Sequence, residues 1–449
     1  MGEKISFREK LSYAFGDMGC NFVWSTVSMF LTLYYTDSVG ISAAVVGTIM
    51  LVTRLLDGVT DLVFGTILDR THTKWGKARP WILWSMPMMA IGLILTFHVP
   101  SAFSETGKIV YASVTYIFVA AFAYTASNLS YNALLSLMTA NQEERTSTST
   151  IRFICTFATA IVLSSVTMPL VNTIGWSGTS ILYAVLSAIC FLITFSGTKE
   201  RYQEEKKEEK KEQVSVIDGF RLLFKNKYFI PITLLFVAVY TASGLSGGIG
   251  IYYAREIIGN ENAFGLINMA NMIPIVIGLP LFPVLAKRFG KWKCMMAGTL
   301  MQIVGILLVL TQPESLTMLL IGQVIRGLGM APNTAGLFAL VADGVFYGEW
   351  KNGVRQDGLF NSVTSFGMKV GTGLGSAIVG WGLAIGNYNA QLAAQTEETL
   401  MAIKVLYLVL PLIIMAAGLV FLGFSNIDKI YPTMEKELAE RAQKGQAGK

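Results

Sequence analysis

An apolar stretch near residues 42–68 contains three charged residues, Arg54, Asp57 and Asp61. Their spacings of three and four residues place the three side chains on one face of a helix. If this helix crosses a bilayer, each charge near its centre costs about 2.5–3.5 kcal/mol, and carboxylates on adjacent turns repel each other. Since one Arg balances only one acid, we expect Asp57 and Asp61 to bind a proton or a small cation. The alternative is a structural Arg–Asp pair with one spare acid.

Two other apolar stretches combine polar and aromatic residues at helical spacing. Near 11–35, Asp17, Asn21 and Trp24 share one helix face. Near 109–138, Asn128 and Asn132 share a face with Tyr124, and the same stretch also contains Thr125 and Tyr131. Amide and carboxylate groups bind sugar hydroxyls, and an aromatic ring stacks on the apolar face of a sugar, so together these residues favour a polar central cavity. The alternative for each residue is an interhelical hydrogen bond worth under about 1 kcal/mol.

Two basic residues, Arg152 and Lys369, lie in further apolar stretches near 149–172 and 358–385. Lys369 points away from a stripe of glycines at 367, 371 and 375, which is suited to close packing on a neighbouring helix. We therefore expect Lys369 to face the cavity, where it contacts substrate or balances an acid. Arg152 lies near the end of its stretch, so it either faces the cavity or reaches the membrane interface.

The composition identifies the molecule that holds these residues. The chain has 449 residues, of which 53% are hydrophobic and 14% charged, against roughly a quarter charged in soluble proteins. This predicts an integral membrane protein and excludes a water-soluble enzyme or a nucleic-acid-binding protein. The four cysteines form no CxxC pair and there are two histidines, so we expect no disulfide framework, transition-metal site or cofactor. The first ten residues are charged and the first apolar stretch is long, so no cleavable signal peptide is predicted.

Twelve apolar stretches are long enough to cross a bilayer as helices. They lie near 11–35, 42–68, 80–99, 109–138, 149–172, 178–197, 228–254, 262–286, 294–312, 315–342, 358–385 and 399–424. Of the 35 Lys and Arg residues, five lie within spans and two, Lys108 and Arg255, lie in one set of loops. The other 28 lie in the opposite loops and the termini. Basic residues favour the cytoplasmic side, so both termini are predicted to be cytoplasmic in a multi-pass plasma-membrane protein.

The two halves of the chain are similar. We expect an N-terminal six-helix bundle at 1–197, a charged cytoplasmic linker at 198–227, a C-terminal six-helix bundle at 228–425 and a cytoplasmic tail at 426–449. The loops DRTHTKWGKARPW and AKRFGKWKC occupy matching positions in the two halves. Glycines in the first span of each half predict interrupted helices beside a binding cavity, with close helix packing as the alternative.

Several segments together resemble the glycoside–pentoside–hexuronide:cation symporters, a branch of the major facilitator superfamily that includes melibiose, glucuronide and xyloside carriers. The matching segments are YAFGD, YYTDSVG, RLLDGVTD, TKWGKARPW, ADGVFYGEWKNGVR and the surroundings of Lys369, and the match runs from about Leu11 to Phe424. The resemblance implies twelve helices, alternating access, and a cation site at Asp57, Asp61 and Thr125. It also implies a sugar site or salt-bridge network at Asn21, Tyr124, Asn128, Asn132, Arg152, Thr334 and Lys369.

The sequence therefore predicts symport of a glycoside with H⁺ or Na⁺, without an enzymatic activity. We expect a monomer by analogy with the fold. Two alternatives stay open at this stage: a carrier of amphiphiles or lysolipids on the same fold, and a membrane sensor that does not transport. No phosphate-binding loop of the GxxxxGK[ST] type occurs in the sequence, so ATP-driven transport is not predicted.

Overall fold

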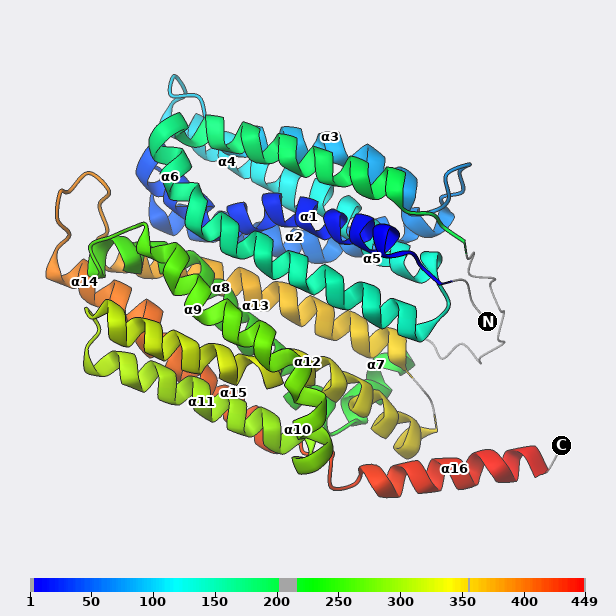
Figure 1. Ribbon diagram of the computed structural model, residues 1–449. Helices are drawn as coiled ribbons and strands as arrows, with labels where there is room; N and C mark the ends of the chain where they lie inside the picture. Colours follow the sequence, from blue (N-terminus) through cyan, green and yellow to red (C-terminus); the bar gives the residue numbers. More distant parts are fainter. Residues whose placement is uncertain (1–3, 202–215, 354–355, 448–449) are drawn as a thin grey trace. The chain divides into compact units, whose positions relative to one another are not determined.

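The computed structural model describes residues 4–201, 216–353 and 356–447, and the described residues form helices joined by short loops (Figure 1). The elements are α1 (Phe7–Leu33), η1 (Tyr34–Val39), α2 (Ala43–Arg70), α3 (Arg79–Thr96), α4 (Glu105–Ile117), η2 (Phe118–Ala123), α5 (Tyr124–Met138), α6 (Gln142–Gly197), α7 (Val216–Lys225), α8 (Phe229–Tyr252), η3 (Tyr253–Ile257), α9 (Ala263–Gly278), η4 (Leu279–Leu281), α10 (Phe282–Phe289), α11 (Lys291–Thr311), α12 (Leu316–Asn352), α13 (Asp357–Ile385), α14 (Glu397–Lys404), η5 (Val405–Val409), α15 (Leu410–Phe424) and α16 (Tyr431–Ala447).

These helices confirm the prediction of twelve spans. Within the described residues, nine helices are long and apolar enough to cross a membrane. One of them, α6, contains two spans, because Gly175 adopts φ 72° and ψ 173° and breaks its 56 residues near the middle. The helices α1 and α3, with 27 and 18 residues, complete the set of twelve. Several spans are composite, since π-helical turns join α4 to α5 and α14 to α15 without leaving the helix.

The structure divides into two compact units. Unit 1 comprises Met1–Lys207, Gly244–Met269 and Gly373–Tyr407, and unit 2 comprises the ranges Glu208–Ser243, Ala270–Thr372 and Leu408–Lys449. Unit 1 therefore includes parts of four spans from the second half of the sequence. The division at the linker into two six-helix bundles stays a prediction. Most of the acidic and basic part of that linker, 202–215, lies outside the described residues.

In unit 1, α1 packs along α6, and α3 packs against α5 and α6. The glycines of α1 serve this packing: a Cβ on Gly16 would lie 2.6 Å from the Tyr131 ring, and one on Gly19 would lie 3.2 Å from the Cys190 side chain. Similarly, a Cβ on Gly250 of α8 would lie 2.8 Å from Phe264. The prediction of glycine-interrupted helices was wrong, because both helices continue through their glycines.

In unit 2, α11 packs along α12, where two pairs of glycines bring the backbones together. A Cβ on Gly298 would lie 2.5 Å from the Gly329 carbonyl oxygen. The predicted glycine stripe on α13 also meets a neighbour: a Cβ on Gly371 would lie 2.6 Å from the backbone carbonyl of Val237 in α8. Small residues thus permit close helix contact in this unit.

The matched basic loops have matching structures. In the first half, the Glu200 carboxylate accepts hydrogen bonds of 2.7–2.8 Å from the backbone N–H groups of residues 77–79, where α3 begins. In the second half, Asp428 accepts one of 2.9 Å from a backbone N–H in the first turn of α11. Gly76 and Gly290 precede these helices with φ of 109° and 90°. In each half an acid that follows the last span neutralises the positive end of the third.

Candidate functional site

The predicted cation site lies where α2 meets the start of α5 in unit 1. The Asp57 side chain is buried, and the Thr125 hydroxyl donates a 2.8 Å hydrogen bond to Asp57 Oδ1. Asp61 is half-buried and lies one turn further along α2. Thr125 follows directly on the π-helical turn η2, and such turns rotate the residues after them relative to a regular α-helix. The structure therefore brings together an acid and a hydroxyl 68 residues apart.

Arg54 connects this acidic face to a pair of aromatic rings. The Arg54 guanidinium lies 3.7 Å from the centroid of the Trp24 ring. Trp24 in turn stacks on Tyr124, with 4.2 Å between the ring centroids. A cation over an indole face is attracted by the ring quadrupole, and the attraction strengthens when both groups are removed from water, as the buried Arg54 is here. Trp24 and Tyr124 therefore lie beside the charges of α2.

From Tyr124, a row of hydrogen bonds continues along α5. Asn128 Nδ2 donates to the Tyr124 hydroxyl at 3.3 Å, and Asn132 Nδ2 donates to Asn128 Oδ1 at 2.9 Å. Arg152 of α6 then donates from Nη1 to Asn132 Oδ1 at 3.0 Å. The three α5 residues occupy successive turns, as their spacing predicts. Asn132 is exposed and Asn128 is half-buried, so their amides are accessible to a ligand.

Arg152 points into the protein and pairs with Asp17. Its Nε lies 2.9 Å from Asp17 Oδ2, and the side chains of Arg152 and Asp17 are 20% and 7% exposed. Thr156, one turn along α6, donates its hydroxyl to the same carboxylate oxygen. Arg152 also lies 5.1 Å from the ring of Tyr131. Of the two predicted alternatives for Arg152, the structure therefore favours the one in which its side chain faces the interior of the protein.

The other predicted sugar-binding residues differ in their surroundings. Asn21 is half-buried on α1, where it donates to the Asp17 carbonyl at 2.9 Å and accepts from the Ser25 hydroxyl at 3.0 Å. Lys369 and Thr334 belong to unit 2. Lys369 is half-buried on α13, and the Thr334 hydroxyl donates to a backbone carbonyl of its own helix. Their place in a common cavity with Asn21 stays a prediction.

Sequence reasoning missed Thr156 and a second charged cluster. Thr156 follows Arg152 by four residues, so helical spacing alone would have placed it on the same face. The second cluster joins Asp37 to Arg255 at 2.7 Å, at the ends of the first spans of the two sequence halves. Little in the sequence indicated the Asp37–Arg255 cluster, because charged residues are common at the ends of membrane spans.

Taken together, the site in unit 1 consists of the Asp57–Thr125 pair and a series of contacts that runs from Arg54 to Asp17. At one end, Asp57 and Asp61 are two acids one helical turn apart, and a bound cation or proton would relieve the repulsion between them. At the other end the charges of Arg152 and Asp17 offset each other. The middle consists of amides and an aromatic pair, which suit neutral hydroxyl groups and the apolar face of a sugar ring.

Comparison with known proteins places this chain among membrane transporters. Residues 12–429 match the family model described as MFS/sugar transport protein. The isoprimeverose transporter of Lactiplantibacillus pentosus is 32% identical over 97% of this chain and 92% of its own length. The uncharacterized symporter YnaJ of Bacillus subtilis (strain 168) is 32% identical over 98% of this chain and 96% of its own. A crystal structure of the nucleoside transporter NupG has the same fold, with a TM-score of 0.65 at 16% identity over 93% of this chain and 99% of that one.

Proposed function

The chain belongs to the MFS/sugar transport protein family, among the glycoside–pentoside–hexuronide:cation symporters, and we propose that it couples the uptake of a neutral glycoside to a cation, H⁺ or Na⁺. As a member of this family it is a membrane transporter and not an enzyme. The single observation that supports cation coupling is the Thr125–Asp57 hydrogen bond, which joins the acid of α2 to the helix that carries the amides. The relatives named as symporters and as an isoprimeverose transporter agree with this proposal.

The pairing of Arg152 supports a neutral substrate. Its guanidinium binds the Asp17 carboxylate and the Asn132 amide oxygen, so both Nε and Nη1 are occupied. A uronate would have to compete with Asp17 for this guanidinium. The Asn128 and Asn132 amides have both donors and acceptors, which match sugar hydroxyls and do not match a long acyl chain. These side chains therefore disfavour the alternative of an amphiphile or lysolipid carrier.

The cation site and the sugar site can be coupled because both use residues of α5. A cation or proton at Asp57 and Asp61 relaxes the repulsion between these two acids of α2. Thr125, which binds Asp57, and Asn128, which would bind sugar, lie within one turn of each other on α5. A cation that fixes Thr125 therefore favours the sugar-binding arrangement of α5. By reciprocity, bound sugar raises the affinity for the cation by the same factor.

Topology completes the proposal. The loops with most of the basic residues are proposed to be cytoplasmic, with both termini on that side of the plasma membrane. The ends of the first spans, at Asp37 and Arg255, then lie at the extracellular face. The protein is proposed to act as a monomer.

The test is transport by the purified protein in liposomes. Neutral glycosides and hexuronides are offered under an imposed Na⁺ or H⁺ gradient. We expect accumulation of a neutral glycoside with one of the two gradients, and none when the gradient is collapsed. Sugar binding without any counterflow would instead indicate a sensor, and accumulation of hexuronides alone would contradict the neutral site.

A further inference from the structure

The first span of each sequence half ends in the same way. Tyr34-Tyr35-Thr36-Asp37 and Tyr252-Tyr253-Ala254-Arg255 align without a gap, and each segment forms a π-helical turn, η1 in the first half and η3 in the second. Both turns are followed by a glycine with positive φ, 81° at Gly40 and 73° at Gly259. The alignment puts an acid in one half at the position of a base in the other.

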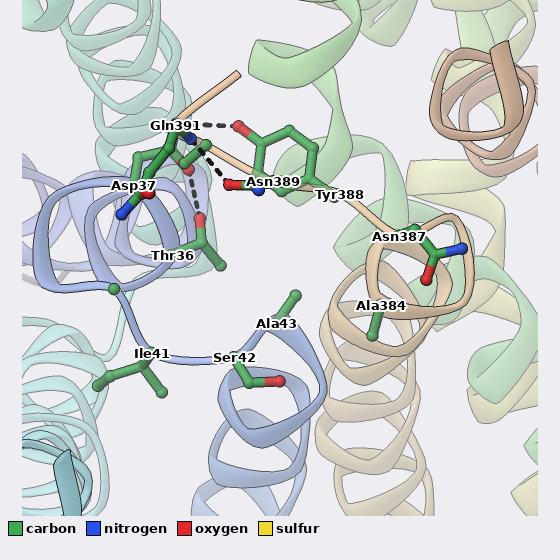
Figure 2. Close-up of a pocket in the computed structure, with 12 residues that line it drawn as sticks. Thr36, Asp37, Ile41, Ser42, Ala43, Ala384, Asn387, Tyr388, Asn389 and Gln391 are labelled. Atoms are coloured by element: carbon green, nitrogen blue, oxygen red, sulfur yellow. Dashed lines mark hydrogen bonds between the residues drawn. The ribbon is translucent and has the colours of Figure 1, made fainter. Parts of the chain in front are cut away.

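These two matched residues bind each other. Arg255 Nη1 lies 2.7 Å from Asp37 Oδ2, and the Tyr388 hydroxyl donates to the same oxygen at 2.9 Å. Arg255 also donates to the Tyr388 hydroxyl and, at 2.8 Å, to the Glu256 carboxylate. Tyr388 comes from the loop after α13, so three separate segments meet at one carboxylate. Figure 2 shows Asp37 and Tyr388 side by side at the wall of a cavity of about 460 Å³.

The layer beneath this cluster is closed. The Thr36 hydroxyl is within 2.8 Å of the Tyr252 hydroxyl, and Tyr252 is fully buried. The adjoining helices α2 and α13 touch through their backbones, since a Cβ on Gly380 would lie 2.4 Å from the Ala43 carbonyl oxygen. Thr36, Asp37 and Tyr388 line the cavity in Figure 2, so the cluster forms part of its wall. All of these contacts lie within unit 1.

We propose that Asp37, Arg255 and Tyr388 form the contact that holds the extracellular entrance closed, and that this contact must break in each transport cycle. The inference rests on the proposed function and topology. Neither the cation site nor the sugar site includes these residues. The two π-helical turns place the opposite charges at equivalent positions of the internal repeat, so that closing the entrance brings them together.

The energetics suit a contact that opens and closes. Asp37 and Arg255 are 16% and 28% exposed, so the pair is partly desolvated but remains in contact with water. A fully buried charge pair would cost too much free energy to break, whereas an exposed pair would contribute little to the stability of the closed state. Removing one partner should therefore shift the equilibrium toward the open entrance, because only the closed state contains the contact.

The first experiment measures opening without any sugar. Asn21→Cys is labelled from outside intact cells with a membrane-impermeant thiol reagent, in the parent and with Asp37→Asn added. We expect labelling to become about ten-fold faster with Asp37→Asn, as loss of a partly buried charge pair predicts. Each gate variant without Asn21→Cys corrects for the four native cysteines.

Matched variants separate a gate from a merely structural pair. Glu105→Gln is the control, because Glu105 is an exposed acid at the start of α4, at the same proposed face of the membrane and outside this cluster. It should leave labelling unchanged. Tyr388→Phe keeps the ring and removes the hydroxyl, and it should accelerate labelling less than Asp37→Asn does. The exchange Asp37→Arg with Arg255→Asp should return labelling toward the parent rate.

Uptake gives the second readout. Asp37→Asn should lose most active accumulation of glycoside, and the charge exchange should restore part of it. Unchanged labelling with Asp37→Asn and with Tyr388→Phe would overturn the gate, whatever the transported sugar is. If labelling accelerates as expected but no glycoside is transported, the gate stands and the proposed substrate fails.

Discussion

At the scale of single residues, the pair formed by Asp17 and Arg152 determines what the site offers to a substrate. Their side chains join α1 to α6 at 2.9 Å and are mostly buried. Thr156 and Asn132 complete the hydrogen bonding of the two charged groups. A charge pair with this support presents no free charge, so substrate recognition falls to the neighbouring amides.

Breaking one side of this pair should damage sugar binding more than removing both. Asp17→Asn or Arg152→Gln leaves a partly buried charge without its partner, and each should weaken glycoside binding at least about ten-fold. The double variant should recover part of that loss. Calorimetry on purified protein measures the affinities, with Glu144→Gln as control because its 2.8 Å pair with Lys10 joins the same two helices. Equal effects of all four variants would show that the pair holds helices together and nothing more.

Helical spacing predicted the local part of this site and could not predict the rest. Asn128 and Asn132 are neighbours because they are four residues apart on one helix, and the structure joins them at 2.9 Å. The direction of Arg152 was open, because its partner Asp17 is 135 residues away and the contact depends on how α1 packs on α6. Long-range pairs of this kind are fixed by tertiary packing, on which periodicity gives no information.

At the scale of elements, the irregular turns η1, η2, η3 and η5 are π-helical and occur where no sequence pattern predicted them. A π-helical turn adds one residue to a helix and needs no particular residue type. The glycines that suggested interruptions in α1 and α8 instead admit neighbouring side chains, as Gly16 admits the ring of Tyr131. Gly16, Gly19 and Gly250 therefore indicate close packing, and the irregularities of these spans are the π-helical turns η1 and η3.

Two glycines of α13 provide a direct test of this packing. A Cβ on Gly371 would meet the Val237 carbonyl oxygen at 2.6 Å, whereas one on Gly358 would meet nothing within 4 Å. Gly371→Ala should therefore destabilise the protein by about 1–3 kcal/mol through overpacking. Gly358→Ala should be neutral or stabilising by up to about 1 kcal/mol, since alanine favours helix. Thermal unfolding in one detergent compares them, and equal melting temperatures would contradict the packing argument.

At the scale of the whole molecule, the number of spans could be predicted because hydrophobic length is a property of each stretch of sequence. The family could be predicted because several segments together resemble it. The compact units could not be predicted. Unit 1 gathers Gly244–Met269 and Gly373–Tyr407 with the first half of the chain, which follows from contacts such as that of Asp37 with Arg255. These contacts belong to one conformational state, and a sequence encodes all the states of a transporter at once.

Lys369 tests whether unit 2 takes part in coupling. Lys369→Ala should reach the membrane in normal amount, because one half-buried basic side chain is not needed for insertion, but it should lose active accumulation. Membrane abundance and uptake are measured on the same cells. Lys293→Ala, at an exposed position of α11, is the control and should accumulate sugar normally. Normal accumulation by Lys369→Ala would remove this residue from the mechanism.

The central claim is that Asp57 and Asp61 bind the coupling cation, and the most direct test separates sugar exchange from sugar accumulation. Asp57→Asn and Asp61→Asn each replace an acid with a neutral amide of similar size, as protonation would. Counterflow and uphill uptake are measured in the same proteoliposomes over a range of pH and Na⁺, with Glu105→Gln, an exposed acid at the start of α4, as control. We predict that Asp61→Asn retains counterflow and loses uphill uptake, and that Asp57→Asn is impaired at least as strongly. Uphill uptake by both variants with the parent's cation dependence would contradict the account.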